Sequence, residues 1–422
     1  MRWIKPARTL RGTMRGMTEH VLVSGCGIGG LAAALALARS GQRVHLLEQA
    51  PAFGEVGAGL QLGPNAVRVL DSWGLSEDLR ATAAFPEALQ VRDAHSARTL
   101  GRLRLGALAR ARYGQPYATL HRADLHGLLL AAVQRERGVH LHLGVRVASY
   151  DASDEGVRLR CENDETFEGV ALIGSDGLWS RVRRQMLGAH PVRASGHLAY
   201  RGMVRAADLP PALRSPVVTA WLGPRLHAVH YPVRLGAWFN VVVVVQGVIG
   251  QGHGGAVGSD PQSWTHEAHA EDLRRTLGPA SRDLLAMVDA VQAWKLWPLN
   301  DRPPMSGPHE HAQGRVALLG DAAHPLRPYL AQGAAMAIED AWTLGRLTQA
   351  GHGQVLDWPD VLDRFARTRW ARNARVQARS ARNGTVFHAT GALKWARDAA
   401  MATLGESLLD NPWLYSGPPE PL

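Results

Sequence analysis

Cysteine and long hydrophobic runs are both scarce in this 422-residue chain. It has only two cysteines, Cys26 and Cys161, and no CxxC pair. That scarcity argues against a disulfide scaffold and against a dithiol redox site. No apolar run comes near the roughly 20 residues of a membrane-spanning helix. The valine run Val241–Val245 is better explained as a buried strand, so we expect no membrane span.

Charge of one sign is not concentrated in a tail or block. The net charge is +10, from 47 Lys and Arg against 37 Asp and Glu. Such an excess allows a nucleic-acid partner, but the basic residues interleave with acids and carry no nucleic-acid motif, so we expect none. A basic helical run predicts a solvated or interface helix. Its members are Arg364, Arg367, Arg369, Arg372, Arg375, Arg379 and Arg382.

The first 17 residues are interpreted as a basic N-terminal extension. Residues 1–16 lack the apolar stretch of a secretory signal, and Met17 is an alternative start. The default expectation is therefore a cytoplasmic protein. A hydrophobic content of 46% with 20% charged residues is typical of a globular protein, and the length predicts more than one domain.

A strand, a glycine turn and a helix open the chain. His20–Ser24 is a short apolar strand, the helix Leu31–Arg39 is apolar nearly all round, and Arg43–Leu47 is a second strand that closes in Glu48. Between strand and helix, Gly25, Gly27 and Gly30 form GxGxxG. In a dinucleotide site these glycines give the tight turn, the close approach to a pyrophosphate and the helix packing.

Glu48 strengthens the dinucleotide interpretation. It lies 18 residues beyond Gly30, near the spacing of about 20 at which an acid accepts hydrogen bonds from a ribose. The motif does not separate NAD from FAD. The alternative is a glycine-rich turn with an ordinary surface glutamate.

The middle of the chain predicts a β-rich insertion. We expect helices over Asn65–Leu79, Arg122–Glu136 and Ser263–Leu277, several strands between residues 191 and 245, and a loop or mobile flap in the glycine-rich residues 247–261. From Ile338 onward the chain is mostly helical, with a loose tail at 417–419. The plan is α/β, with a βαβ sheet domain, an insertion and a helical cap.

A second ligand-binding pattern lies between residues 314 and 344. A strand over Val316–Leu319 leads to Asp321, and the turn Ala331–Gly333 opens an alanine-rich helix. An acid after a buried strand, followed by free helix-start amides, suits an electron-rich ring with a polyol tail. This combination indicates a flavin.

Two further sites are ambiguous alone. Asp176-Gly177 ends a strand and is equally typical of an ordinary turn. Arg122 begins a helix and could clamp a pyrophosphate or be a solvated arginine.

Taken in order, these motifs resemble a known family. The glycine motif with Glu48, then HRADLH (121–126), IGSDGLWSRVR (173–183) and LLGDAAHP with AQGAAMAIEDA (318–341), resemble the FAD-dependent aromatic-ring hydroxylases. These are class A flavoprotein monooxygenases of the para-hydroxybenzoate hydroxylase type. The phrases at 57–70 and 227–234 are most similar to the branch with salicylate hydroxylases, 3-hydroxybenzoate 6-hydroxylases and 6-hydroxynicotinate 3-monooxygenases. The resemblance covers about residues 18–390.

The resemblance implies a fold and a domain division. It implies an FAD-binding Rossmann-like domain of the glutathione-reductase type, an inserted β-rich substrate domain and a C-terminal helical region. The FAD-binding domain would take residues 18–80, 113–190 and 300–345, the substrate domain 81–112 and 191–299, and the helical region with its tail 346–422.

The resemblance also implies a site. The FAD residues would be Gly25, Gly27, Gly30, Glu48, Arg122, Asp176, Gly177, Asp321, Gln332, Gly333 and Ala334. His227 and Tyr231 match the family's His-xxx-Tyr on a strand of the substrate domain, where even spacing puts both on one face and His230 on the other. His227 would be the general base near the substrate hydroxyl. The alternative is that both are core residues. Tyr329 would line the ring pocket, and no metal is expected.

The implied reaction uses NADH or NADPH to reduce FAD, and dioxygen to form a flavin hydroperoxide that hydroxylates an aromatic ring. A hydroxybenzoate or salicylate-like acid is the expected substrate, and a 6-hydroxynicotinate-type heteroaromatic acid is the alternative. Pro328 stands where 3-hydroxybenzoate enzymes tend to carry Gln, which argues weakly against that substrate. A related FAD epoxidase or reductase, and a binding module with a degenerate fold, are further alternatives. We expect a monomer or homodimer.

Overall fold

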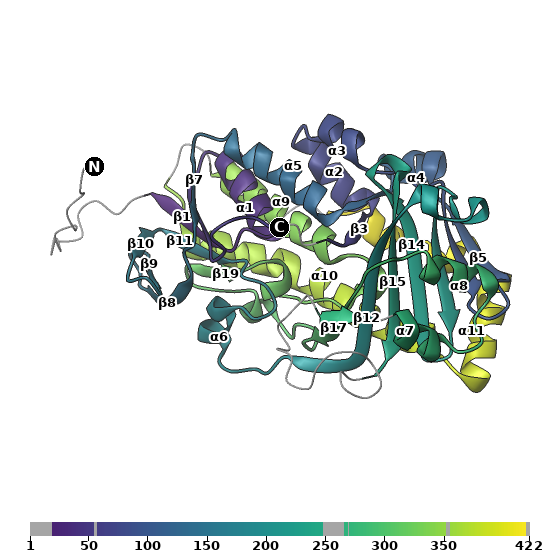
Figure 1. The fold of residues 1–422 in the computed structure, drawn as a ribbon. Coiled ribbons are helices and arrows are strands. Elements are labelled where there is room, and N and C mark those ends of the chain that lie inside the picture. The colour runs from purple at the N-terminus through teal and green to yellow at the C-terminus, as the bar shows by residue number, and fades with distance from the viewer. Residues whose placement is uncertain (1–18, 55–56, 248–265, 269, 352–354, 419–422) are drawn as a thin grey trace, which may run out of the picture.

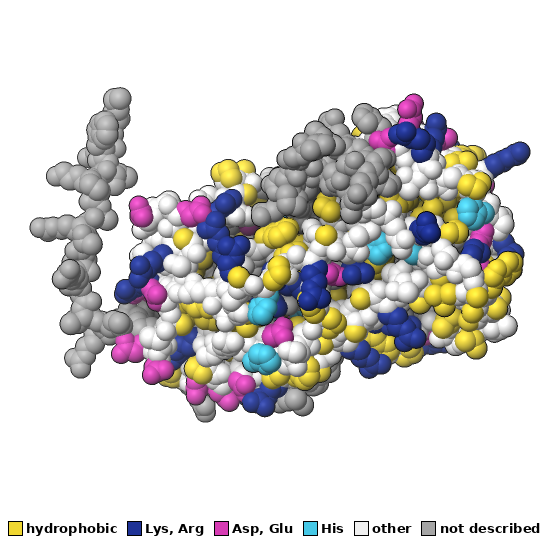
Figure 2. Space-filling view, turned by 90° about the horizontal axis from the view of Figure 1, so that it is seen from below, with side chains coloured by type: hydrophobic (Ala, Val, Ile, Leu, Met, Phe, Trp, Pro, Cys, Tyr) yellow, Lys and Arg dark blue, Asp and Glu magenta, His cyan; other side chains and the backbone are white. Residues whose placement is uncertain are grey.

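The computed structural model describes residues 19–54, 57–247, 266–268, 270–351 and 355–418. The predicted N-terminal extension and nearly all of the predicted glycine-rich loop lie outside these residues. Among the described residues, no helix combines the length and hydrophobicity needed to cross a bilayer. In the face seen in Figure 2, basic side chains are interspersed with acidic and hydrophobic ones.

A mostly parallel sheet forms one half of the molecule (Figure 1). Its strand order is β18-β19-β11-β1-β2-β7, with only β18 antiparallel to its neighbour. The strands are β1 (His20–Ser24), β2 (Arg43–Glu48), β7 (Val139–Leu143), β11 (Ala171–Gly174), β18 (Ala312–Gln313) and β19 (Val316–Leu318). The central position of β1 places the glycine turn at the carboxyl edge, where open α/β sheets bind ligands.

Alternation along β1 decides which layer covers each face of this sheet. Val21 and Val23 pack with the helices α1 (Ile28–Arg39), α5 (Arg122–Gln134) and α9 (Gly333–Ala350). Leu22 packs instead with a three-stranded sheet made of β8 (Val147–Ala152), β9 (Val157–Cys161) and β10 (Thr166–Gly169). The parallel sheet is therefore sandwiched, as its continuous apolar strands require.

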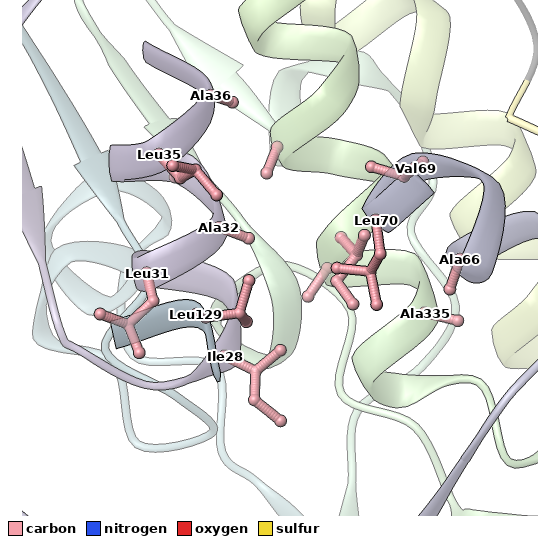
Figure 3. Close-up of a cluster of buried hydrophobic side chains, with 14 of the residues drawn as sticks. Ile28, Leu31, Ala32, Leu35, Ala36, Ala66, Val69, Leu70, Leu129 and Ala335 are labelled. Atoms are coloured by element: carbon pink, nitrogen blue, oxygen red, sulfur yellow. The ribbon is translucent and has the colours of Figure 1, made fainter. Parts of the chain in front are cut away.

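Small residues let α1 and α9 approach closely. A Cβ at Gly345 would lie 2.9 Å from the Cβ of Ala36. Figure 3 shows the same alanine-rich side of α1, with Ala32 and Ala36, in a buried cluster that also takes in Leu70 and Ala335. This packing fixes the start of α9 relative to the glycine turn.

An eight-stranded sheet forms the other half. Its order is β16-β17-β12-β15-β14-β13-β4-β5, and only β13 and β4 pair in parallel. The strands are β4 (Ala88–Asp93), β5 (Thr99–Arg104), β12 (Arg193–Arg205), β13 (Val217–Gly223), β14 (Leu226–Val233), β15 (Trp238–Gln246), β16 (His266–Ala268) and β17 (Trp294–Asp301). One face packs on α7 (Ala270–Leu277) and α8 (Arg282–Asp289). The opposite face contacts Ala58 and Tyr329 from the parallel-sheet half.

Three expectations for single elements were wrong. The helix predicted over Asn65–Leu79 is two helices, α2 (Pro64–Ser72) and α3 (Ser76–Thr82), because Gly74 between them has a φ of +65°. The helix predicted over Ser263–Leu277 begins outside the described residues, and its described part is strand β16 followed by α7. The predicted loose tail is packed at Gly417, whose carbonyl accepts a hydrogen bond from Arg68.

The remaining elements join the halves and complete the C-terminal region. The strands β3 (Gly59–Leu62) and β6 (Ala118–His121) pair between the halves. The helices are α4 (Gly106–Tyr113), α6 (Arg181–Leu187), α10 (Trp358–Phe387), α11 (Gly391–Leu404), α12 (Glu406–Leu409) and α13 (Pro412–Tyr415). The predicted α/β class with a β-rich insertion and a helical C-terminal region is confirmed.

The basic run on α10, predicted to be a solvated or interface helix, is only partly solvated. Arg369 is fully buried and pairs with Glu339 at 2.8 Å and with Asp340 at 2.8 Å. Arg372 also reaches Glu339, at 2.7 Å, whereas Arg367 is mostly exposed. The run therefore divides between a solvated side and an inward side that neutralises two acids of α9.

Candidate active site

The glycine turn after β1 is tight at two positions and open at the third. Gly25 has a φ of +98°, and a Cβ there would lie 2.6 Å from the Ser175 carbonyl oxygen. A Cβ at Gly30 would lie 1.8 Å from the carbonyl oxygen of Gly25. A Cβ at Gly27 would meet nothing within 4 Å. The turn therefore needs glycine for its own packing at 25 and 30, while Gly27 leaves open space at the start of α1.

Glu48 is held against this turn by backbone donors. Its carboxylate accepts from the backbone N–H of Cys26 at 2.8 Å and from that of Ala50 at 2.9 Å. The Cys26 thiol is buried, and burial with the nearby Glu48 charge raises its pKa. The thiol therefore stays protonated and takes no part as a nucleophile.

Asp176 lies beside the same turn, with its Cα 3.1 Å from the position that a Cβ of Gly25 would occupy. Its carboxylate accepts from Ser180 Oγ at 2.5 Å and from the backbone N–H of Arg181 at 2.8 Å. It therefore caps α6. Burial raises the pKa of Asp176, and these hydrogen bonds lower it by less than burial raises it. Gly177 follows with a φ of +76°.

The start of α9 is a second open helix terminus. Ala331 has a φ of +52°, Gln332 precedes the first helical residue, and the first turn carries no acid. A Cβ at Gly333 would meet nothing within 4 Å. Gln332 is buried; its Oε1 accepts from Asn65 at 3.2 Å, while its Nε2 has no partner among the described residues. Free N–H groups and the helix dipole favour an electron-rich group here.

Asp321 and Arg122 interact electrostatically between the two helix starts. Solvent reaches Asp321, although protein surrounds it on nearly all sides. Burial raises the pKa of Asp321, and the charges of His324 and Arg122 oppose that rise. Burial likewise lowers the pKa of Arg122, opposed by Asp321. An accessible carboxylate enclosed in this way is placed to accept hydrogen bonds from a bound polyol.

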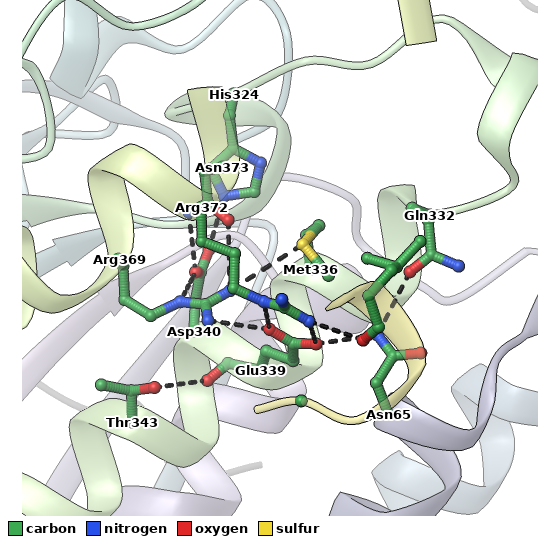
Figure 4. A network of polar contacts seen from close by, with 12 residues as sticks. Asn65, His324, Gln332, Met336, Glu339, Asp340, Thr343, Arg369, Arg372 and Asn373 are labelled. Atoms are coloured by element: carbon green, nitrogen blue, oxygen red, sulfur yellow. Dashed lines mark hydrogen bonds and ion pairs between the residues drawn. The ribbon is translucent and has the colours of Figure 1, made fainter. Parts of the chain in front are cut away.

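A buried ionic network holds this region in place (Figure 4). Asp340 accepts from the backbone N–H of Gly320 at 3.3 Å and contacts His324 Nε2 at 2.5 Å. Asn65 donates to Glu339 at 2.7 Å as well as to Gln332. Asp340 of α9 thus holds the turn that carries Asp321, and Asn65 links Gln332, at the start of α9, to Glu339 in the same helix.

A possible metal-ligand cluster lies within this network. The ligand atoms of His311, His324 and Asp340 lie within 4.8 Å of one another. Asp340 is already paired with Arg369, and a guanidinium at that distance repels a cation. The ion pairs of Asp340 with His324 and Arg369, and the hydrogen bond between Asn373 and His311, explain these residues.

The strand register assigns the residues on the inner face of the eight-stranded sheet. Strand β15 lies between β14 and β12, and each of its residues pairs with one residue on either side. In this way His227 is level with Ala199, Val229 is level with Arg201, and Tyr231 is level with Met203. Since paired residues share a face, His227, Tyr231 and Arg201 point to the same side. His230 points to the opposite face, where its Nδ1 accepts from Trp221 Nε1 at 3.1 Å.

Arg201 is a candidate functional residue that the sequence interpretation missed. Its guanidinium lies 3.9 Å from the ring centre of Trp297, its buried Nε has no hydrogen-bond partner, and it forms no ion pair with any described acid. Burial lowers the pKa of Arg201 to about 10; its titratable neighbours are Tyr231, which opposes this lowering, and Arg122, which adds to it. It therefore stays cationic at neutral pH. The sequence did contain a signal for this residue. Side chains alternate between the two faces along β12, which places Arg201 between Ala199 and Met203 on the inward face.

His227 and Tyr231 share a face but have different surroundings. Buried His227 has its Nδ1 2.8 Å from His388 Nε2, and its ring centre lies 5.1 Å from that of Tyr329. Burial and two neighbouring histidines hold the pKa of His227 well below its usual value. Tyr231 lies against β3, where a Cβ at Gly59 would be 2.8 Å from its ring. Burial raises the pKa of Tyr231, so its hydroxyl stays protonated.

Comparison with known proteins places the chain in a family. The FAD binding domain family matches residues 18–380. The 3-hydroxybenzoate 6-hydroxylase of Polaromonas naphthalenivorans is 38% identical over 379 residues, or 90% of this chain and 90% of that protein. The 6-hydroxynicotinate 3-monooxygenase of Bordetella bronchiseptica is 34% identical over 328 residues, 78% of this chain and 82% of that protein. A salicylate hydroxylase in a substrate complex superposes with a TM-score of 0.76 at 25% identity, covering 94% of this chain and 97% of that one.

These matches confirm the resemblance found in the sequence and the flavin cofactor that it implied. The chain belongs to the FAD binding domain family as a class A flavoprotein monooxygenase, and it is an FAD-dependent aromatic hydroxylase.

Proposed function

We propose that the enzyme hydroxylates a small aromatic acid that already carries a ring hydroxyl, a hydroxybenzoate or salicylate-like compound. Arg201 carries this proposal, because this half-buried cation, whose buried Nε has no partner, lies on the face that also presents His227 and Tyr231, and no described acid pairs with it. A buried charge is costly unless it is paired. A substrate carboxylate would supply the missing partner, with bidentate hydrogen bonds that a guanidinium suits.

FAD fits the residues predicted for it. The open positions at Gly27 and Gly333, the accessible carboxylate of Asp321 and the unpaired Nε2 of Gln332 all lie at the two helix starts or between them. We assign the adenosine diphosphate half to Gly25, Gly27, Gly30 and Glu48, with Arg122, Asp176 and Gly177 near the phosphates. We assign the ribityl chain to Asp321 and the flavin edge to Gln332, Gly333 and Ala334. When bound and reduced, FAD supplies the chemistry that transfers oxygen from dioxygen.

The side chains of the substrate face have separate tasks. His227 is neutral at neutral pH and accepts the proton of the substrate hydroxyl, which raises the electron density of the ring. Tyr231 donates a hydrogen bond from its protonated hydroxyl, and Arg201 holds the carboxylate. Tyr329 closes the apolar side with Ala58 and Trp297, which keeps water from the reacting ring.

The domain division and the use of NAD(P)H complete the proposal. We assign residues 18–80, 113–190 and 300–345 to the FAD-binding domain, 81–112 and 191–299 to the substrate domain, and 346–422 to the helical region. In the part of the chain that the structure describes, the one GxGxxG motif is that of Gly25, Gly27 and Gly30, which we assign to FAD, so NAD(P)H reduces FAD without a Rossmann site of its own.

A substrate panel tests the proposed function. Purified enzyme is assayed with hydroxybenzoates, salicylate, hydroxynicotinates and the matching carboxamides, scoring NAD(P)H oxidation and a product that gains one oxygen. We expect an acid to be the best substrate and its carboxamide to lose about 10- to 100-fold in kcat/KM, the worth of a charge-assisted hydrogen bond. Arg201→Met should reduce this preference, and Arg201→Lys should keep part of it. Equal use of acid and amide by the unaltered enzyme would contradict the proposal.

The second candidate substrate is a 6-hydroxynicotinate-type acid. The Bordetella bronchiseptica relative at 34% identity favours it. Such an acid also carries a carboxylate for Arg201 and an ionisable hydroxyl for His227, so the two candidates share one site. The same panel separates them by relative kcat/KM.

A further inference from the structure

Three imidazoles from three separate elements meet at one end of the substrate face. His227 comes from β14, His197 from β12, and His388 from the residue that ends α10. The His388 ring centre lies 5.0 Å from that of His227 and 4.8 Å from that of His197. Phe387 and Tyr329 pack around His227. Among the described residues whose rings contact His227, His388 and Tyr329 can form hydrogen bonds and Phe387 cannot.

The nitrogen atoms of these rings form an ordered series. His227 Nδ1 and His388 Nε2 lie 2.8 Å apart, so one proton is shared between them. The other nitrogen of His388, Nδ1, is buried without a partner, and so is Nδ1 of His197. His227 and His388 are buried, whereas His197 is half-buried. The series thus runs along the inner face of the sheet, from buried His227 to half-buried His197.

The charges around these rings keep them neutral. Burial lowers the pKa of His388 to about 3, with His197 and Arg397 adding to the effect. Burial also lowers the pKa of His197, where Arg327 adds to the effect and Asp301 opposes it. Arg327 and Asp301 are themselves an ion pair, and the Tyr329 phenol has a raised pKa. None of the three imidazoles therefore stores a proton at neutral pH, which suits transfer through the rings.

We propose that His388 relays the proton of the substrate hydroxyl away from His227 toward His197 and solvent. This rests on the proposed function, in which His227 accepts that proton. The substrate O–H bond breaks and its proton binds His227 Nε2. The proton on His227 Nδ1 moves to His388 Nε2, and His388 releases its own Nδ1 proton toward His197 or water. One proton enters and one leaves, and nothing is oxidised or reduced. His388 does not touch the substrate; it acts through His227.

The proposed relay gives the proton that His227 accepts a way out of the site. Among the described residues, the rings of Tyr329 and Phe387 pack against buried His227, so a proton that it accepts needs a neighbouring group to carry it onward. Without an exit, each turnover would leave an imidazolium in a site that burial strongly disfavours. An imidazole at 388 passes a proton on, whereas an amide or a phenyl ring at the same place does not.

A nitrophenol probe tests the relay without turnover. 3-Hydroxy-4-nitrobenzoate carries a carboxylate and a phenol whose ionised form absorbs visible light. Oxidised, FAD-loaded enzyme is mixed rapidly with the probe over a pH series, and the rate of phenolate formation and the probe Kd are measured. We compare unaltered enzyme with His388→Gln, which keeps a hydrogen-bond acceptor for His227 but cannot relay. His230→Gln, a buried histidine on the opposite face, is the matched control.

We expect His388→Gln to slow phenolate formation at least tenfold while the probe Kd changes less than threefold, and His230→Gln to leave the rate unchanged. His197→Gln should slow phenolate formation less than His388→Gln does. If His388→Gln fails to hold FAD, the rate of phenolate formation in His197→Gln tests the relay instead. Unchanged ionisation rates in the variants, with FAD bound, would overturn the relay and leave the proposed function intact. A probe that the unaltered enzyme binds but does not ionise would overturn both.

Discussion

His324 Nε2 lies 2.5 Å from Asp340 Oδ2, and both side chains are almost completely buried. The contact joins the loop that follows Asp321 to the helix whose start is proposed to hold the flavin edge. Burial raises the pKa of Asp340, but the contacts with His324 and Arg369 outweigh burial, so that the pKa is lowered. The acid therefore stays ionised and keeps the loop and α9 in register.

Arg369→Met should destabilise the enzyme strongly. The change leaves Glu339 and Asp340 buried with fewer partners, and breaking one side of a buried ion pair costs about 3 kcal/mol or more. Urea unfolding of the FAD-loaded protein measures the free energy of unfolding. Arg367→Met removes an exposed arginine of the same helix and serves as the control, with little change expected. Equal effects of the two changes would show that the buried network does not contribute.

Asp321→Ala should abolish tight FAD binding. The carboxylate is the proposed acceptor for the ribityl hydroxyls, and hydrogen bonds to a charged group contribute about 1.5–3 kcal/mol each. FAD content is read from the visible absorbance of purified protein and from FAD released on denaturation. Asp321→Asn keeps the size and one acceptor oxygen, and it should weaken FAD binding less than Asp321→Ala. Full FAD content in Asp321→Ala would remove this residue from the site.

His227→Ala should slow hydroxylation roughly 100-fold or more, which is the usual contribution of a general base. FAD should stay bound, because none of the proposed FAD residues contacts this side chain. Steady-state turnover with the best substrate of the panel provides the rate, and absorbance provides the FAD content. If the variant turns over at the normal rate, His227 is a core residue and the alternative interpretation of its strand holds.

The stability of the protein should fall as the pH drops from about 6.5 toward 3. Burial, with a contribution from Arg92, lowers the pKa of His230 to about 3 in the folded state, so between these values the unfolded state binds a proton that the folded state does not. Stability from this group is complete above pH 6.5. It declines by up to about 1.4 kcal/mol per pH unit below that. His230→Gln should show a shallower decline in urea unfolding at pH 7, 6 and 5. An unchanged slope would exclude this histidine as a source.

The sequence predicts the parts of the site that depend on a few consecutive residues. Gly25, Gly27 and Gly30 follow a strand and precede a helix, and steric demands at such a turn are local. The same holds for Asp321 and for the glycine that begins α9. Local pattern therefore locates both helix starts.

The missed residues owe their roles to contacts made across the fold. Arg369 belongs to a run of similar arginines, and only Phe365, Asn373 and Val376 at helical spacing mark it as part of the buried side. His388 meets His227 across 161 residues, which no local pattern predicts. The break between α2 and α3 at Gly74 was visible as a glycine, but helical spacing on both sides outweighed it.

The order of strands in the parallel sheet has a consequence for how the chain is made. β1 is synthesised first, yet β11 next to it must wait for β19, some 140 residues later, to cover its other edge. A nascent chain that has passed β11 but not β19 carries an open parallel edge and an apolar α1 without α9. Such exposed edges and slow, long-range pairings promote association between unfinished chains. The ribosome-bound protein is thus expected to be most vulnerable to aggregation while its β-rich insertion is being translated, and the strand and helix that complete the proposed flavin site also end that period.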